Sequence, residues 1–291
     1  NSLEELKYPK RLLLEYLRLT KIINMSKINW GIIGLGNIAN IFADAFKFSN
    51  KGNLLAISSK NEKKLKDFKI KFKIENKYTF NNYDNLIEDK YIDIIYIAVP
   101  NSMHFEIILK CIKNNKIVLV EKPATINLKE AKIISSALKK KNLLFGEAFM
   151  YKFNPQINKT LELIKNNEIG EIIKFESNFG NDILTSFKFL GIKIPKKIDQ
   201  NKRLFNKDLG GGSILDLGSY CVSLCCLISS LSSSVTKYEV LSKKNELCSS
   251  GVDIDSFVEL EINGNFIAKL NASFKKNIGR ESKILGTKGE L

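Results

Sequence analysis

The stretch Trp30–Asn40 constrains the fold of this chain more than any other part of the sequence. A short apolar run, Ile28–Ile33, stops abruptly at closely spaced glycines, and such a run indicates a buried strand. Beyond the glycines, apolar residues return with helical spacing; they are Ile38, Ile41, Phe42 and Phe46. The sequence therefore predicts a strand, a tight turn and a helix.

The small residues of this turn suit the binding of a dinucleotide. Gly34 permits the sharp turn, Gly36 lets a pyrophosphate approach the backbone, and Ala39 lets the helix pack closely on the strand. The N-terminus of the helix would supply N–H groups and a partial positive charge. An unrelated α/β unit can contain the same glycine turn, so the remainder of the chain has to decide.

Length and composition favour a soluble globular protein of one large or two ordinary domains. The chain has 291 residues, of which 44% are hydrophobic and 26% charged. Its most apolar segment, Cys221–Leu231, is shorter than the roughly 20 residues that span a bilayer, so we interpret it as a buried helix. No secretory leader is evident. We expect a cytoplasmic protein without a membrane partner.

Metal and nucleic-acid binding are both disfavoured. The five cysteines fit no metal-ligand spacing and the chain has one histidine, so we expect no metal site. The net charge of +15 raises the hypothesis of a nucleic-acid partner. The excess is spread evenly and is almost entirely lysine, with no arginine cluster, which favours an ordinary solvated surface.

The sequence predicts three segments. Residues 1–26, with an amphipathic helix over 2–19, form an N-terminal extension or the tail of a preceding domain. Residues 27–148 form a dinucleotide-binding domain. Residues 149–291 form a second domain, which we expect to be incomplete at its C-terminus because the strand Ser282–Leu285 is followed only by a turn.

The end of the second strand favours NADP(H), with NAD as the alternative. After the strand Asn53–Ser59, NAD enzymes usually carry a carboxylate for the ribose hydroxyl. Here Ser59 and Lys60 stand in that region, and they would bind a 2′-phosphate. Lys60 is also open to a simpler interpretation as one more surface lysine.

Two further apolar runs, Ile92–Val99 and Ile117–Val120, read as strands buried on both faces of a parallel sheet. The helix capped by Asn127 and the strand Leu143–Phe145 complete a doubly wound parallel sheet. His104 follows the first run, either near the nicotinamide or as a packing residue. Lys122 follows the second, at the sheet edge where such folds present their chemistry.

Four motifs together resemble the Gfo/Idh/MocA oxidoreductase family, most of all its dihydrodiol dehydrogenase and NADP-dependent sugar dehydrogenase branch. They are Gly34–Ala39, Ala98–His104, Val120–Pro123 and Glu147–Pro155. The resemblance implies a Rossmann domain followed by an α+β domain with a largely antiparallel sheet, and it extends over residues 27–291. Lys152 and Asn154 depart from it, because relatives often carry Arg and His there.

The resemblance also implies which residues hold the cofactor and which carry the chemistry. The cofactor set comprises Gly34, Gly36, Asn37, Ile38, Ser59, Lys60, Pro100, Asn101, His104, Glu121 and Lys122. Many relatives place a histidine at the position of Tyr220, whereas the dihydrodiol dehydrogenase branch has tyrosine there.

Asp216 and Tyr220 follow the glycine run 210–212, which must bring the backbone close to another group. Because they are four residues apart in a predicted helix, both project from one face. We assign Tyr220 as acid/base and Lys122 as its electrostatic partner and substrate anchor. Asp216 would orient them. We expect the Lys122 ammonium to lower the tyrosine pKa from about 10.

The C-terminal part alternates as sheet. Val258, Leu260 and Ile262 face one way, and Asn263 and Gly264 predict a hairpin turn. The other face is free for a partner, and relatives often associate through this sheet, so we expect a homo-oligomer. Residues 180–208 read as an irregular connection that holds the substrate specificity.

Together these features predict an NADP(H)-preferring oxidoreductase. It would transfer a hydride between nicotinamide and a secondary alcohol or carbonyl of a sugar, polyol or trans-diol. The alternative is a catalytically silent NAD(P)-binding redox sensor, which would need the glycine turn but not Lys122 with Tyr220.

Overall fold

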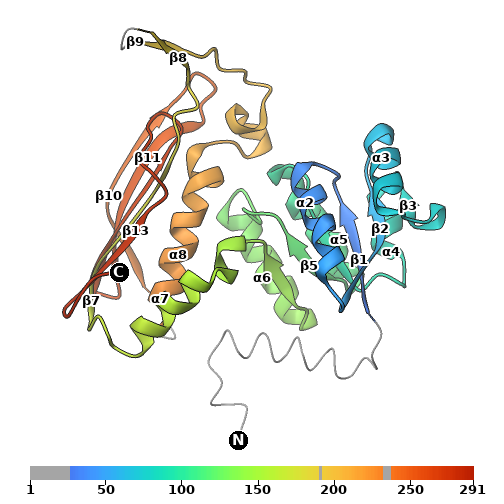
Figure 1. Cartoon of the computed structure of the whole chain (residues 1–291), viewed down its shortest axis with the longest axis horizontal. Helices are drawn as coiled ribbons and strands as arrows, with labels where there is room; N and C mark the ends of the chain where they lie inside the picture. Colours follow the sequence, from blue (N-terminus) through green and yellow to red (C-terminus); the bar gives the residue numbers. More distant parts are fainter. Residues whose placement is uncertain (1–26, 190–191, 232–236) are drawn as a thin grey trace, which may run out of the picture. The chain divides into compact units, whose positions relative to one another are not determined.

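The computed structural model describes residues 27–189, 192–231 and 237–291 (Figure 1). The helix predicted over residues 2–19 lies outside these ranges. Contacts between Cα atoms divide the chain into two compact units. The first is Asn1–Ala98 with Lys110–Val118, and the second is Val99–Leu109 with Leu119–Leu291.

A six-stranded sheet has the strand order β3-β2-β1-β4-β5-β6. Its strands are β1 (Ile28–Ile33), β2 (Gly52–Ser58), β3 (Thr79–Phe80), β4 (Ile94–Ile97), β5 (Ile117–Val120) and β6 (Phe145–Glu147). β1 runs parallel to β2 and β4, and β2 runs parallel to β3. This order is that of a dinucleotide-binding Rossmann sheet, which confirms the predicted fold class. The last strand starts two residues later than the sequence predicts.

The helices that connect these strands differ in how they begin, and three of them start at an asparagine cap. They are α2 (Asn37–Ala45), α3 (Glu62–Phe72), α4 (Tyr83–Glu88), α5 (His104–Lys113) and α6 (Leu128–Lys141). The side chains of Asn61 and Asn82 accept backbone N–H bonds at the starts of α3 and α4. Asn127 accepts the N–H of Glu130 at 3.0 Å, as the capping pattern predicts.

Helices α2 and α4 cover opposite faces of β1. The Trp30 ring lies 5.5 Å from Phe42 of α2. A Cβ at the next residue, Gly31, would lie 2.8 Å from Leu86 of α4. Successive residues of a strand point to opposite faces, so the sheet carries helices on both sides in this first unit.

The buried face of α2 differs from the apolar pattern in the sequence. Ile38 is 40% exposed and Ile41 is 67% exposed, whereas Ala39 and Ala43 are buried. Small residues face the sheet because the helix lies close to it, and Phe42 stacks on Tyr96 with ring centroids 3.9 Å apart.

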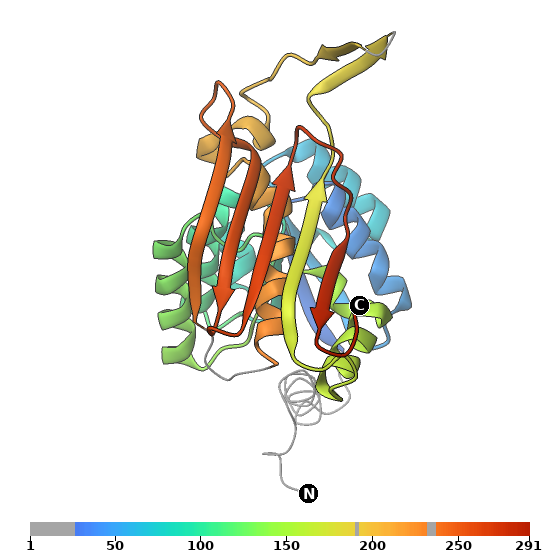
Figure 2. The same cartoon turned by 90° about the vertical axis from the view of Figure 1, so that its left-hand side faces the viewer.

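The second unit contains a five-stranded sheet with the order β10-β11-β12-β7-β13 (Figure 2). The strands are β7 (Ile172–Gly180), β10 (Tyr238–Leu247), β11 (Asp253–Ile262), β12 (Phe266–Ser273) and β13 (Ser282–Gly286). All neighbours are antiparallel except β12 and β7, which are parallel. The predicted hairpin joins β11 to β12, with positive φ at Asn263 and Gly264.

One face of this sheet is covered by α8 (Ser219–Ser229), as Figures 1 and 2 both show. Cys221, Cys225 and Ile228 of α8 join a core cluster with Phe175 and Leu270. A π-helical turn, Ile214–Gly218, leads directly into α8. Gly218 lets this turn approach the sheet, since a Cβ there would lie 3.2 Å from that of Ala272. α7 (Pro155–Lys165) precedes β7.

One helical segment of the described residues, Lys207–Ser229, is long and apolar enough to cross a membrane by length and composition alone. Of its most apolar window, 44% is buried inside the protein. The apolar side chains of α8 pack on the five-stranded sheet, as in a core helix.

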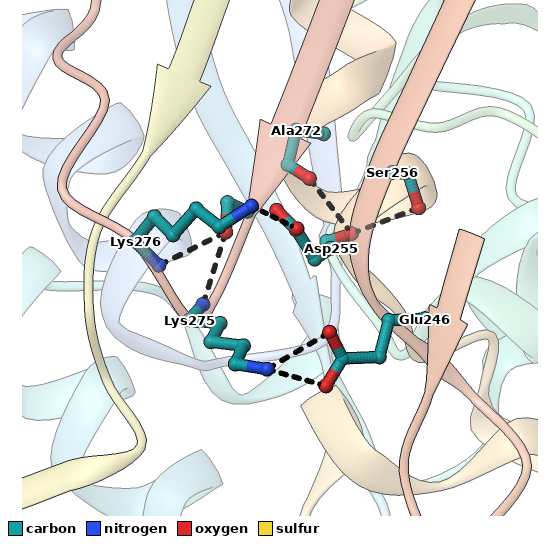
Figure 3. Close-up of polar contacts among 8 residues, drawn as sticks. Glu246, Asp255, Ser256, Ala272, Lys275 and Lys276 are labelled. Carbon is teal, nitrogen blue, oxygen red and sulfur yellow. Dashed lines mark hydrogen bonds and ion pairs between the residues drawn. The ribbon is translucent and has the colours of Figure 1, made fainter. Parts of the chain in front are cut away.

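The opposite face of the sheet is charged. Lys269 pairs with Glu259 across β12 and β11 at 3.1 Å, and Lys276 pairs with Asp255 at 2.5 Å. Figure 3 shows the second of these pairs beside that of Lys275 with Glu246. Val258 and Leu260 alternate with Glu259 and pack against the core, as predicted.

The connection 180–208 is more regular than the sequence predicts. Strands β8 (Thr185–Phe189) and β9 (Ile192–Pro195) form a two-stranded hairpin, which Figure 2 shows extending away from the five-stranded sheet. Two short 3-10 turns follow, at Arg203–Phe205 and Lys207–Leu209. The prediction of an irregular connection is therefore wrong for the first half of this segment, which contains the hairpin.

Candidate active site

The glycine turn between β1 and α2 has the geometry that phosphate binding requires. Gly34 has φ +89°, which permits the sharp turn, and its N–H donates to the Ser58 carbonyl of the neighbouring strand at 3.0 Å. Gly36 caps α2 without a side-chain hydrogen bond, and a Cβ placed on it meets no atom within 4 Å. Ala39 is fully buried. The open backbone at Gly36 at a helix N-terminus fits a pyrophosphate.

Lys60 and Ser59 differ in their access to a ligand. Ser59 is 6% exposed, and its hydroxyl accepts the Asn61 N–H at 3.1 Å. Lys60 is exposed at the end of β2, with its Nζ 5.5 Å from the centroid of the Tyr83 ring. Lys60 is therefore the member of the pair that can reach a phosphate without rearrangement.

In the second unit, Asn101 and His104 are buried and bonded to backbone. Asn101 Nδ2 donates to the Gly210 carbonyl at 3.1 Å. His104 is completely buried, with Nδ1 2.9 Å from the Pro123 carbonyl and Nε2 2.9 Å from the Val99 carbonyl. Burial lowers the pKa of His104, although the two backbone bonds oppose this effect. This geometry favours the packing role among the two considered for His104.

Lys122, Asp216 and Arg203 form one ionic cluster. Lys122 Nζ donates to the Asp216 carbonyl at 2.7 Å and lies 3.4 Å from its carboxylate Oδ1. Arg203 Nη2 donates to the same Oδ1 at 3.0 Å. The side chains of Lys122 and Asp216 are each 16% exposed, and that of Arg203 is 41% exposed. Asp216 thus holds two cations, and it orients Lys122.

Tyr220 lies against Lys122 in aromatic surroundings. Lys122 Nζ is 4.8 Å from the centroid of the Tyr220 ring. Phe149, Tyr151 and Phe179 surround that ring at centroid distances of 5.5, 6.3 and 5.4 Å. The structure thus brings together the three residues predicted to carry the chemistry.

We predicted that the Lys122 ammonium lowers the pKa of Tyr220, and this prediction is wrong. Burial raises the pKa of Tyr220, and the negative charges of Glu121 and Asp216 raise it further. The Lys122 ammonium contacts the face of the ring, and Asp216 takes its hydrogen bonds. The phenol therefore stays protonated near neutral pH in the protein alone.

Sequence reasoning missed several neighbours of this cluster. Arg203 lies in the segment 180–208, which we predicted to be an irregular connection, and it is bonded to Asp216. Phe179 carries no signal in the sequence, yet its ring contacts that of Tyr220, and the Arg280 guanidinium lies 5.2 Å from the Phe179 ring centroid. Lys152 lies over the Phe149 ring at 5.3 Å.

Metal ligands do not gather in the part of the chain that the structure describes. No group of three or more His, Cys, Asp or Glu side chains there could hold an ion. Glu121 adjoins Lys122 in the sequence, and Glu147 contacts the backbone two residues beyond Lys122. Burial raises the pKa of Glu147, whose Oε1 accepts the Ala124 N–H at 2.8 Å.

A Rossmann sheet with an open glycine turn, together with a lysine and tyrosine cluster, defines the class of nicotinamide-dependent oxidoreductases. The comparisons agree with that class. Residues 28–149 match the Gfo/Idh/MocA oxidoreductase family profile with its NAD-binding Rossmann fold, and residues 157–291 match the Gfo/Idh/MocA C-terminal domain. The chain belongs to the Gfo/Idh/MocA oxidoreductase family, which confirms the resemblance, and it is an NAD(P)-dependent oxidoreductase.

Among characterised relatives, the trans-1,2-dihydrobenzene-1,2-diol dehydrogenase of Xenopus laevis is 29% identical over 262 residues. The match covers 89% of this chain and 73% of the relative.

Solved structures share the fold. An aldose-aldose oxidoreductase from Caulobacter crescentus, complexed with glycerol, matches with a TM-score of 0.78 at 20% identity, covering 91% and 76% of the two chains. KijD10, a 3-ketoreductase from Actinomadura kijaniata, was solved with NADP and TDP-benzene. It matches with a TM-score of 0.73 at 24% identity, covering 90% and 74%.

Proposed function

We propose that this oxidoreductase prefers NADP(H) and interconverts a secondary alcohol and the matching carbonyl of a sugar, polyol or trans-diol. The observation that carries the proposal is the cluster of Lys122, Asp216 and Tyr220, assembled from two segments far apart in the sequence. A diol dehydrogenase and a ketoreductase among its relatives support this substrate class. When bound, the nicotinamide supplies the hydride acceptor or donor.

Each residue of the cluster has a separate role in this proposal. Tyr220 moves the proton at the substrate oxygen, as acid in carbonyl reduction and as base in alcohol oxidation. Lys122 donates a hydrogen bond to that oxygen, and Asp216 with Arg203 keeps the ammonium in place. Because the phenol is protonated near neutral pH, the resting enzyme is prepared for reduction.

The residues present in the first unit fit a nicotinamide dinucleotide. The backbone around Gly34 and Gly36 would hold the pyrophosphate, with the adjoining Asn37 and Ile38 of α2. Lys60, helped by Ser59, would hold the 2′-phosphate that distinguishes NADP from NAD. In the second unit, Pro100, Asn101, His104 and Glu121 would lie near the cofactor. His104 would act there through the backbone carbonyls that it binds.

A fluorescence titration with NADPH and NADH side by side tests the cofactor preference. We expect tight NADPH binding and weaker NADH binding. Lys60→Ala should weaken NADPH binding by about tenfold, the effect of losing one charge-assisted bond of about 1.5 kcal/mol, and should leave NADH unchanged. Lys66→Ala, which removes an exposed lysine of α3, is the matched control.

Equal binding of the two cofactors would contradict the role of Lys60 but not the enzyme assignment. A screen of secondary alcohols and carbonyls, followed by nicotinamide absorbance, then tests turnover. Cofactor binding without any turnover would favour the redox-sensor alternative.

A further inference from the structure

We propose that Asp253 is a positioning residue whose carboxylate fixes the start of the helix that carries Asp216 and Tyr220. Asp253 is the first residue of β11, far from both in the sequence. The inference rests on the proposed function, because its consequence for catalysis depends on the role of Tyr220.

The Asp253 carboxylate accepts three hydrogen bonds at one oxygen, Oδ2. Ser213 Oγ donates at 2.6 Å, the Ile214 backbone N–H at 2.7 Å and Ser256 Oγ at 3.1 Å. Ser213 is fully buried and Ser256 is 7% exposed, so the donors have little access to water. Hydrogen bonds to an ionised acceptor are roughly twice as strong as neutral ones.

The position of this carboxylate is that of a helix cap. Ile214 opens the π-helical turn that leads into α8, and its N–H has no partner within the helix. A carboxylate there satisfies the N–H and interacts favourably with the helix dipole. Asp253 therefore performs from a neighbouring strand the role that a local N-cap side chain usually performs.

The glycine run 210–212 explains how the carboxylate comes so close. Gly212 has φ +114°, and a Cβ on it would collide with Asp253 Oδ1. Gly210 makes the corresponding approach to Ile126 and Asn101, and Gly211 to the carbonyls of the preceding turn. The group that the sequence required near the end of this run is the Asp253 carboxylate.

The cap is linked to the ionic cluster by one further turn of helix. The Asp216 N–H donates to the Gly212 carbonyl at 3.1 Å, so Asp216 is held by the residue that Asp253 contacts. The Asp216 carbonyl and carboxylate accept hydrogen bonds from Lys122 Nζ, and Tyr220 follows in the next turn. A shift of the helix start would therefore move the partner of Lys122 and the proton-transfer group together.

The test compares Asp253→Asn with Asp255→Asn, which makes the same charge change on the same strand. Asp255 pairs with Lys276 at 2.5 Å on the charged face of the sheet (Figure 3). Hydrogen exchange of the segment 213–220 reports on the cap. The ¹³C resonance of Tyr220, identified among the nine tyrosines by its loss in Tyr220→Phe, reports on the site.

We expect Asp253→Asn to exchange faster over 213–220 and to shift the Tyr220 resonance. With the fastest substrate of the screen, kcat should fall by up to about 100-fold, the effect of a displacement of about 1 Å, while NADPH affinity stays unchanged. Asp255→Asn should change none of these. Ser213→Ala, which removes one donor only, should change them in the same direction and to a smaller extent.

Unchanged exchange and an unchanged Tyr220 resonance in folded Asp253→Asn would overturn the proposal, as would equal effects of Asp255→Asn. If Asp253→Asn does not fold, Ser213→Ala decides by the same two signals. Normal turnover by Tyr220→Phe would instead show that the proposed function fails. The two failures can be told apart because the hydrogen-exchange and resonance measurements need no substrate.

Discussion

At the scale of single residues, the raised pKa of Tyr220 predicts different pH dependences for the two directions. In the proposed mechanism oxidation needs the phenolate, so kcat/KM should rise about tenfold per pH unit between about pH 6 and 9 without a plateau. Reduction needs the phenol and should be independent of pH over that range as far as Tyr220 is concerned. Rate profiles in both directions measure this. A plateau of oxidation near neutral pH would indicate a different base.

The sequence predicts those residues of the candidate site that stand in short motifs. Lys122 follows a buried strand, and Asp216 with Tyr220 follows a glycine run, so local sequence identifies them. Arg203, Phe179 and Asp253 meet them only through the tertiary fold. The pKa of Tyr220 was predicted in the wrong direction because sequence shows the nearby charge but not the burial, which has the larger effect.

At the scale of elements, His104 ties the start of α5 to the backbone beyond Lys122. Its pKa in the folded protein is lowered, so folding favours the neutral ring. The stabilisation is present above the unfolded pKa of about 6.5 and is lost as the pH falls towards the folded pKa. Urea unfolding at neutral and mildly acidic pH should show this loss, and His104→Gln should lack that part of the dependence. An equal pH dependence in both proteins would contradict it.

The strands with clear apolar patterns were predicted to within two residues at each end, and two kinds of element were not predicted at all. β10 was missed because all ten of its residues are exposed, so no alternation marks it. It is held by pairing with β11 rather than by burial. The β8–β9 hairpin was missed although apolar residues alternate with Lys188 and Lys193 in its strands, because the lysine-rich segment 180–208 was read as one irregular connection.

At the scale of the whole molecule, the expected homo-oligomer stays a prediction. The outward face of the five-stranded sheet is occupied by ion pairs such as Lys269 with Glu259. An interface on this face would be polar, so we expect an assembly that light scattering detects at low ionic strength and that weakens as salt screens the charges. Lys269→Glu, which sets two like charges opposite each other, should dissociate it. A monomer under all conditions would contradict this prediction.

Turnover by Tyr220→Phe is the most direct test of the proposed proton transfer by Tyr220. We expect kcat to fall by about 100-fold or more, the usual contribution of a positioned acid/base group, with NADPH affinity unchanged. Tyr151→Phe is the matched control, since it removes a neighbouring hydroxyl that is bonded to Ser223 at 2.9 Å and should have a much smaller effect. A Tyr220→Phe protein with near-normal kcat would contradict the account.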